Sequence, residues 1–97
     1  MGWIVRVSEQ ARGVYTLGLD AHLRDELREQ VALVAEAPED YLFRAMSGAD
    51  LWLHRYTSSQ DPRLVFTLSF ANYDPQERSM TLLTIGRMTI GESEDAE

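Results

Sequence analysis

The sequence contains no cysteine and no lysine, and only two histidines. Without cysteine there can be no disulfide, no thiolate metal ligand and no cysteine nucleophile. Without lysine there can be no Schiff base and no lysine general base, so any contact with a phosphate has to come from an arginine. Two histidines alone make no persuasive metal site. The sequence therefore predicts neither a metal nor a cofactor.

Long apolar runs are also absent. No stretch approaches the ~20 residues that a membrane span requires, and the opening Met-Gly-Trp-Ile-Val-Arg lacks the basic and apolar regions of a signal peptide. We therefore expect a cytoplasmic protein with no membrane contact. A length of 97 residues, 44% of them hydrophobic, suits one globular domain, which we place at residues 1–90.

Acidic residues outnumber basic ones. The sequence has 16 acids and nine arginines, a formal net charge of −7. Four of the acids lie in residues 91–97, which we predict to be an acidic, disordered tail. The remaining 12 acids and nine arginines leave a net charge of −3 on the body. This balance argues against direct binding of free nucleic acid, which a basic surface would favour.

The clearest helix pattern covers Asp20–Ala37. Asp20 is a suitable N-cap, and the apolar residues repeat at spacings of four, four and three, as one buried stripe requires: Leu23, Leu27, Val31 and Val34. Pro38 is expected to end this helix and to start a short second helix at Glu39–Met46.

Four segments have the alternating or β-branched character of strands: Trp3–Val7, Leu51–Thr57, Leu64–Phe70 and Met80–Ile90. Short turns between the last three predict an antiparallel meander. The segment Glu9–Leu19 is open to two readings, a short helix capped by Ser8 or a strand that forms a hairpin with the first one. The predicted fold class is α+β, a small antiparallel sheet of about four strands with one long helix and one or two short helices on one face, in the order β-α(α)-β-β-β.

Short motifs along this order resemble the RelE/ParE toxin superfamily of type II toxin–antitoxin systems. Trp3-Ile-Val-Arg-Val-Ser8 resembles its opening strand, and the helix followed by Pro38 resembles its long helix. Asp50-Leu-Trp-Leu-His-Arg-Tyr56 is similar to a strand of the type L-W-x-x-R, and Pro62-Arg-Leu-Val-Phe66 to the type Y-R-V-I-Y. Leu82-Leu-Thr-Ile-Gly-Arg-Met88 is similar to a last strand of the type V-L-x-V-G-H-R. The resemblance covers most of residues 3–88.

The resemblance implies a toxin that acts on DNA gyrase or on ribosome-bound mRNA and is neutralised by an antitoxin. Cleavage of RNA needs a base for the 2′-hydroxyl, cations for the phosphate and an acid for the leaving oxygen. The candidate catalytic cations are Arg55, Arg63 and Arg87, with His54 or Tyr56 as proton handlers. The alternative for Arg63 is an ion pair with an acid of a nearby turn, such as Asp61.

The sequence also departs from the pattern of the mRNA-cleaving members. These members are usually basic and use lysines with a tyrosine or histidine near the C-terminus, whereas this chain has no lysine and ends in acids. The cleavage set is therefore incomplete, and gyrase is the favoured target. The alternative function is a non-enzymatic acidic module that binds or inhibits a protein partner, in which carboxylates imitate the phosphates of a nucleic acid.

Three aromatic residues are candidates for partner binding: Phe43, Trp52 and Tyr56. Core packing is the alternative for Trp52 in particular, because indole rings usually fill cores and sheet edges. A homodimer is also compatible with the sequence, because a small open sheet leaves edge strands unpaired.

Overall fold

The computed structural model describes residues 2–45 and 50–90. Its elements in chain order are β1 (Ile4–Val7), α1 (Glu9–Leu17), α2 (Ala21–Glu36), α3 (Pro38–Tyr41), β2 (Phe43–Arg44), β3 (Trp52–Thr57), β4 (Leu64–Asp74) and β5 (Ser79–Thr89). The five strands form one sheet in the order β1-β5-β4-β3-β2. The predicted α+β class is confirmed, whereas the predicted number of strands is one too low. The predicted acidic tail lies outside the described residues.

The sheet is mixed rather than antiparallel. β1 runs parallel to β5, with Ile4 opposite Ser79 and Val7 opposite Leu82, while the other neighbouring strands are antiparallel. The prediction of an antiparallel sheet is wrong for β1, because α1, α2 and α3 intervene between β1 and the strands that follow. A parallel pair needs such a long crossover, and the helices provide it.

Within the segment Glu9–Leu19, residues Glu9–Leu17 form a helix, so the hairpin alternative is wrong. Ser8 caps this helix, since its Oγ accepts a hydrogen bond from the Ala11 N–H at 3.1 Å. The same hydroxyl donates to the Leu83 carbonyl of β5 at 2.6 Å. Ser8 therefore ends the first strand, begins α1 and attaches that helix to the sheet.

The long helix agrees with its prediction, and the short helix after it does so only in part. Leu23, Leu27 and Val34 are buried, and Val31 packs against the same core. Pro38 opens α3, but this helix ends at Tyr41 because the next residues pair with β3 as β2, so the predicted helix at Glu39–Met46 is wrong in its second half. Met46 itself lies outside the described residues.

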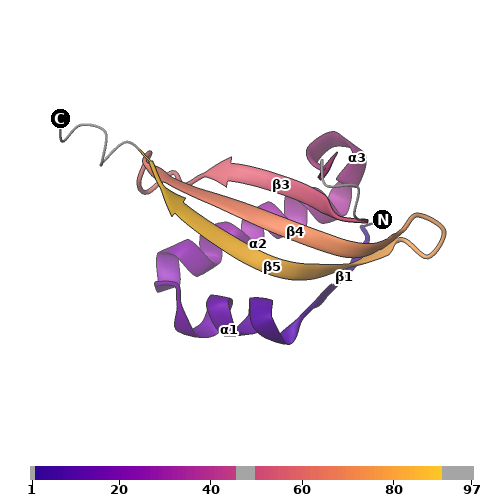
Figure 1. Cartoon of the computed structure of the whole chain (residues 1–97), viewed down its shortest axis with the longest axis horizontal. Helices are drawn as coiled ribbons and strands as arrows, with labels where there is room; N and C mark the ends of the chain where they lie inside the picture. Colours follow the sequence, from indigo (N-terminus) through magenta and orange to yellow (C-terminus); the bar gives the residue numbers. More distant parts are fainter. Residues whose placement is uncertain (1, 46–49, 91–97) are drawn as a thin grey trace.

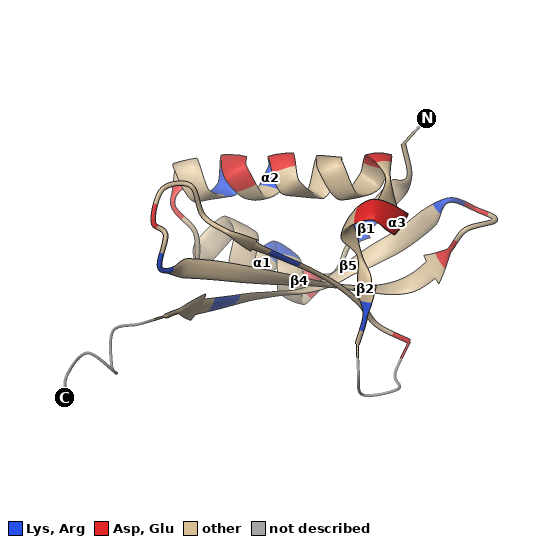
Figure 2. Cartoon of the chain, turned by 90° about the horizontal axis from the view of Figure 1, so that it is seen from above, with Lys and Arg blue, Asp and Glu red and all other residues tan. Residues whose placement is uncertain are grey.

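All the helices cover one face of the sheet. Figure 1 looks onto the open face with α2 behind the strands, and Figure 2 shows α2 and α1 on the same side of the sheet. The alternation predicted for β4 is confirmed, because its fully buried residues belong to the helix-covered face: Phe66, Leu68 and Phe70. Thr67 and Ser69 lie on the other face and are half-buried. Among the described residues, none of the helices has the length and apolar character needed to span a membrane.

Candidate functional site

Arg55 lies on the open face of the sheet. It is exposed, and its Nε donates to the Thr67 hydroxyl of the neighbouring strand at 3.4 Å. His54, the residue before it, belongs to the helix-covered face, as the alternation of side chains along β3 requires. Arg55 can therefore present a guanidinium to a ligand on the open face, but His54 cannot join it there.

Arg63 lies at the turn between β3 and β4. Its Nε is 3.9 Å from the Asp61 carboxylate, and its backbone N–H donates to the same carboxylate at 3.0 Å. The two side chains are 57% and 44% exposed, so solvent screens the pair. The sequence offered an ion pair with Asp61 as the structural alternative for Arg63, and this ion pair is present. A catalytic role for Arg63 remains a prediction.

Arg87 points to the opposite side of the sheet from Arg55. It pairs in register with Phe66, whose side chain is in the core, and its Nη1 donates to the Gly18 carbonyl at the end of α1 at 3.3 Å. Arg55, Arg63 and Arg87 thus occupy the open face, a turn and the helix-covered face. The structure does not bring the three candidate cations together around one phosphate.

His54 is held inside the helix-covered layer. Only 7% of the residue is exposed, its Nε2 lies 2.8 Å from Gln30 Oε1 of α2, and its ring meets the Tyr41 ring edge to face at 5.8 Å. Burial lowers the pKa of the imidazole, because desolvation disfavours the charged form, although the Tyr41 backbone opposes this shift. These contacts give His54 a structural position between α2, α3 and β3.

Tyr56 belongs to the same buried layer. Its ring stacks on Phe66 at 5.3 Å and on His54 at 5.8 Å. Burial first, and then the Glu26 carboxylate, raise the pKa of the phenol far above its ordinary value. The hydroxyl is buried without a hydrogen-bond partner among the described residues. Tyr56 is 8% exposed, so it offers a partner little surface.

Glu26 joins α2 to the turn after β3, a contact that sequence reasoning missed. One carboxylate oxygen accepts hydrogen bonds from the Ser59 N–H and the Ser59 hydroxyl, both at 2.7 Å. Burial alone would raise the pKa of this carboxyl, but the bonds from Ser59 outweigh it, and the pKa lies below the ordinary value of 4.5. Glu26 and Ser59 are 33 residues apart, so no local pattern pairs them.

The other two aromatic candidates lie near the β2 edge. Phe43 is 46% exposed, and its place opposite Leu53 puts it on the open face. Trp52 is half-buried on the helix-covered face, where its ring meets Tyr73 at 4.8 Å and the Arg44 guanidinium at 5.6 Å. Phe43 is thus placed to contact a partner directly, whereas Trp52 mainly packs within the chain.

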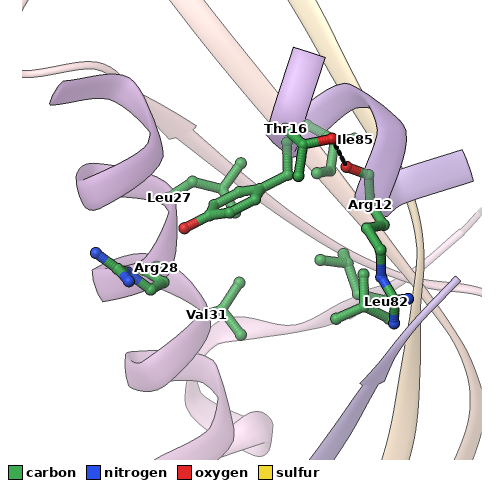
Figure 3. A pocket seen from close by; sticks show the side chains of 9 residues that line it. Arg12, Thr16, Leu27, Arg28, Val31, Leu82 and Ile85 are labelled. Carbon is green, nitrogen blue, oxygen red and sulfur yellow. Dashed lines mark hydrogen bonds between the residues drawn. The ribbon is translucent and has the colours of Figure 1, made fainter. Parts of the chain in front are cut away.

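An apolar pocket of about 360 Å³ lies between α1, α2 and the sheet. α1 contributes Arg12, Tyr15 and Thr16, α2 contributes Leu27, Arg28 and Val31, and the strands contribute Val7, Leu82 and Ile85. Figure 3 shows Arg12 and Arg28 on opposite sides of this pocket, with Leu82, Ile85, Leu27 and Val31 between them. Sequence reasoning could not find it, because α1 was not assigned and its packing beside α2 was unknown.

No group of three potential ligands (histidine, cysteine, aspartate or glutamate) comes together within residues 2–45 and 50–90. What the described residues offer is an open sheet face with the exposed arginines Arg6 and Arg55, and an apolar pocket flanked by Arg12 and Arg28. Both features suit the binding of a partner better than they suit proton transfer.

This layer of helices on one face of a mixed sheet is shared with a solved structure. Among solved structures, the chain matches a chain of the toxin–antitoxin complex RelBE2 from Mycobacterium tuberculosis with a TM-score of 0.72. The two are 14% identical, and the match covers 91% of this chain and 100% of that chain. No protein-family model and no curated protein matches the sequence. At this identity the likeness establishes the fold, and it agrees with the resemblance carried by the motifs.

Proposed function

We propose that this protein is a RelE/ParE-like toxin of a type II toxin–antitoxin pair and that an antitoxin neutralises it. The observation that carries the proposal is the fold shared with a chain of the RelBE2 complex over 91% of the present chain. The motifs that resemble the family lie on β1, β3, β4 and β5 of one sheet.

Gyrase is the target we favour over ribosome-bound mRNA. Cleavage of RNA needs cations and proton handlers around one phosphate. Arg55 lies on the open face of the sheet, whereas His54 and Arg87 lie on the helix-covered face. A toxin that acts by binding an enzyme does not need these groups to converge. The dispersed arrangement therefore supports action by binding.

The antitoxin contact would include the pocket between α1 and α2. Its walls are apolar, and Arg12 and Arg28 flank it, so a segment with apolar side chains and nearby carboxylates would fit both features. Phe43 on the open face would be a second contact. Val31→Glu would place a carboxylate in the pocket wall and should weaken the antitoxin complex.

The alternative, an acidic module that imitates nucleic acid, would need its carboxylates in a continuous stripe. On α2 acidic and basic residues alternate, and Arg28 pairs with Asp25 at 2.7 Å. Mixed charge of this kind is the ordinary surface of a solvated helix. The mixed charge on α2 therefore supports the proposed toxin over an acidic module that imitates nucleic acid.

Induced expression in a bacterial host tests the proposal. We expect growth arrest that is relieved when the product of a neighbouring antitoxin gene is expressed at the same time. Purified protein should then inhibit DNA supercoiling by gyrase and leave ribosome-bound mRNA intact. Cleaved mRNA with unaffected supercoiling would reverse the choice of target. Unaffected growth at good soluble expression would contradict the toxin itself.

A further inference from the structure

The pocket between α1 and α2 has a floor of core residues. Leu27 and Leu82 are 2% exposed and Ile85 is 8% exposed, yet all three line this volume of about 360 Å³. Protein interiors are normally packed as densely as organic crystals, so side chains around an open apolar volume lack contacts that a filling group would supply. The volume also falls within the range of small-ligand pockets, about 300–1,000 Å³. The pocket is therefore suited to a small molecule with an apolar body.

The pocket is preformed, because α1 is attached to β5 at both of its ends. Where the helix begins, the Ser8 hydroxyl donates to the Leu83 carbonyl at 2.6 Å, and just beyond its end the Gly18 carbonyl accepts from Arg87 at 3.3 Å. These attachments oppose a movement of α1 toward α2 that would close the gap between the two helices. A ligand would therefore meet walls that need little reorganisation, which favours affinity.

The lining of the pocket carries positive charge that the chain balances only in part. It includes two arginines and no acid. Arg28 on α2 is paired with Asp25 at 2.7 Å. Arg12 on α1 is exposed, and its guanidinium has no hydrogen-bond or ion-pair partner among the described residues. Figure 3 shows the two arginines on opposite sides of the apolar lining, so the uncompensated cation lies on the α1 side.

We propose that this pocket binds a small amphiphilic carboxylate, with its apolar body between α1 and α2 and its carboxylate on the Arg12 guanidinium. A carboxylate suits this group, because the planar guanidinium can donate two parallel hydrogen bonds to it. Its single negative charge also equals the charge that Arg12 leaves uncompensated, whereas a phosphate dianion would exceed it. The Thr16 hydroxyl supplies no further donor, since it donates to the Arg12 carbonyl within α1 at 2.8 Å.

A ligand in this pocket would compete with the antitoxin segment that we place over the same residues. That consequence rests on the proposed function, whereas the binding of the ligand does not. Binding is measured on the purified chain alone, and growth arrest is measured in cells. Either proposal can therefore fail without the other.

Octanoate is the probe for this site, and calorimetric titration below its micelle-forming concentration measures its affinity. We expect one saturable site on each chain. Octanol has the same apolar chain without the charge, and it should bind about tenfold more weakly, because it cannot form the charge-assisted hydrogen bonds to Arg12. The absence of saturable octanoate binding, or an equal affinity for octanol, would overturn the proposal.

Arg12→Gln tests the position of the carboxylate. The residue is exposed, so the variant should stay folded, and it should bind octanoate about tenfold more weakly while its affinity for octanol is unchanged. The matched control combines Asp25→Asn with Arg28→Gln, which removes the compensated pair from the other wall and leaves the net charge unchanged. This control should keep the preference for octanoate. A preference that survives Arg12→Gln, or that is lost in the control, would overturn the assignment.

Methyl resonances in nuclear magnetic resonance spectra locate the apolar body of the ligand. Octanoate should shift the signals of Val31, Leu82 and Ile85, which line the pocket, and leave those of Leu53 on the open face unchanged. Shifts confined to the open face would place the ligand outside the pocket and would overturn the proposal.

Discussion

The imidazole of His54 on β3 lies 2.8 Å from the side-chain amide oxygen of Gln30 on α2. This contact joins the long helix to the sheet inside a layer of rings, in which His54 stacks on Tyr56 and meets Tyr41 edge to face. It also explains why the histidine within the family-like motif is unavailable to the open face, where Arg55 lies.

Stability should depend on the protonation of His54. Burial lowers its pKa in the folded chain below the ordinary value of 6.5, so the unfolded chain binds the proton more readily. The contribution of the neutral ring is fully present above pH 6.5 and is lost as the pH falls from 6.5 through the lower pKa of the folded state. The melting temperature should fall over this range, and His54→Gln should flatten the fall. An identical slope in the variant would contradict this assignment.

Glu26→Ala should cost about 1–2 kcal/mol in the free energy of unfolding. The substitution removes the acceptor of two hydrogen bonds from Ser59, and bonds to a charged group on a partly exposed residue are worth amounts of this order. Urea denaturation measures the loss, and Glu29→Ala, an exposed acid on the same helix, is the matched control. Because the pKa of Glu26 lies below 4.5 in the folded state, its contribution is present above pH 4.5 and is lost as the pH falls further.

Tyr56→Phe should leave the stability unchanged or raise it slightly. The hydroxyl is buried without a partner among the described residues, so its removal leaves no other group unsatisfied. Tyr56→Ala should instead cost about 3–5 kcal/mol, because it deletes a ring stacked on Phe66. Thermal unfolding distinguishes the two variants. If Tyr56→Phe stayed folded and lost toxicity, Tyr56 would be a proton handler after all.

Arg63→Ala should cost roughly 0–1 kcal/mol, as is usual for an exposed ion pair. The 3.9 Å separation from Asp61 and the high exposure of both groups leave little energy to lose. Thermal unfolding beside the growth assay separates a structural role from a functional one. A folded variant without toxicity would show that Arg63 contacts the target.

The long helix and the central strands could be predicted because their patterns are local, whereas Glu9–Leu19 stayed open between helix and strand. The stripe from Leu23 to Val34 and the alternation along β4 each depend on the spacing of neighbours in the chain. β2 could not be predicted, because two residues carry no periodicity and form a strand only by pairing with Leu53 and Trp52. The parallel β1–β5 pair depends on the path of three helices, which no short segment encodes.

The candidate residues could be predicted one by one from the sequence, but their arrangement in space could not. Arg55 and His54 are adjacent on β3 and therefore point to opposite faces, which follows from their positions in the sequence once the strand is assigned. The hydrogen bond from the Arg87 side chain to the Gly18 carbonyl depends on where α1 ends. The pocket between α1 and α2 depends on how the two helices pack. Both need the tertiary arrangement, because their residues come from distant parts of the chain.

The most direct test of the toxin proposal is the count of viable bacteria after induced expression, with and without co-expression of a small protein encoded by a neighbouring gene. Soluble protein must be measured in the same cultures, so that the absence of an effect can be interpreted. The account predicts a loss of viability that co-expression reverses, together with a stable complex of the two proteins. Undiminished viability at high soluble expression, with no complex formed, would contradict it.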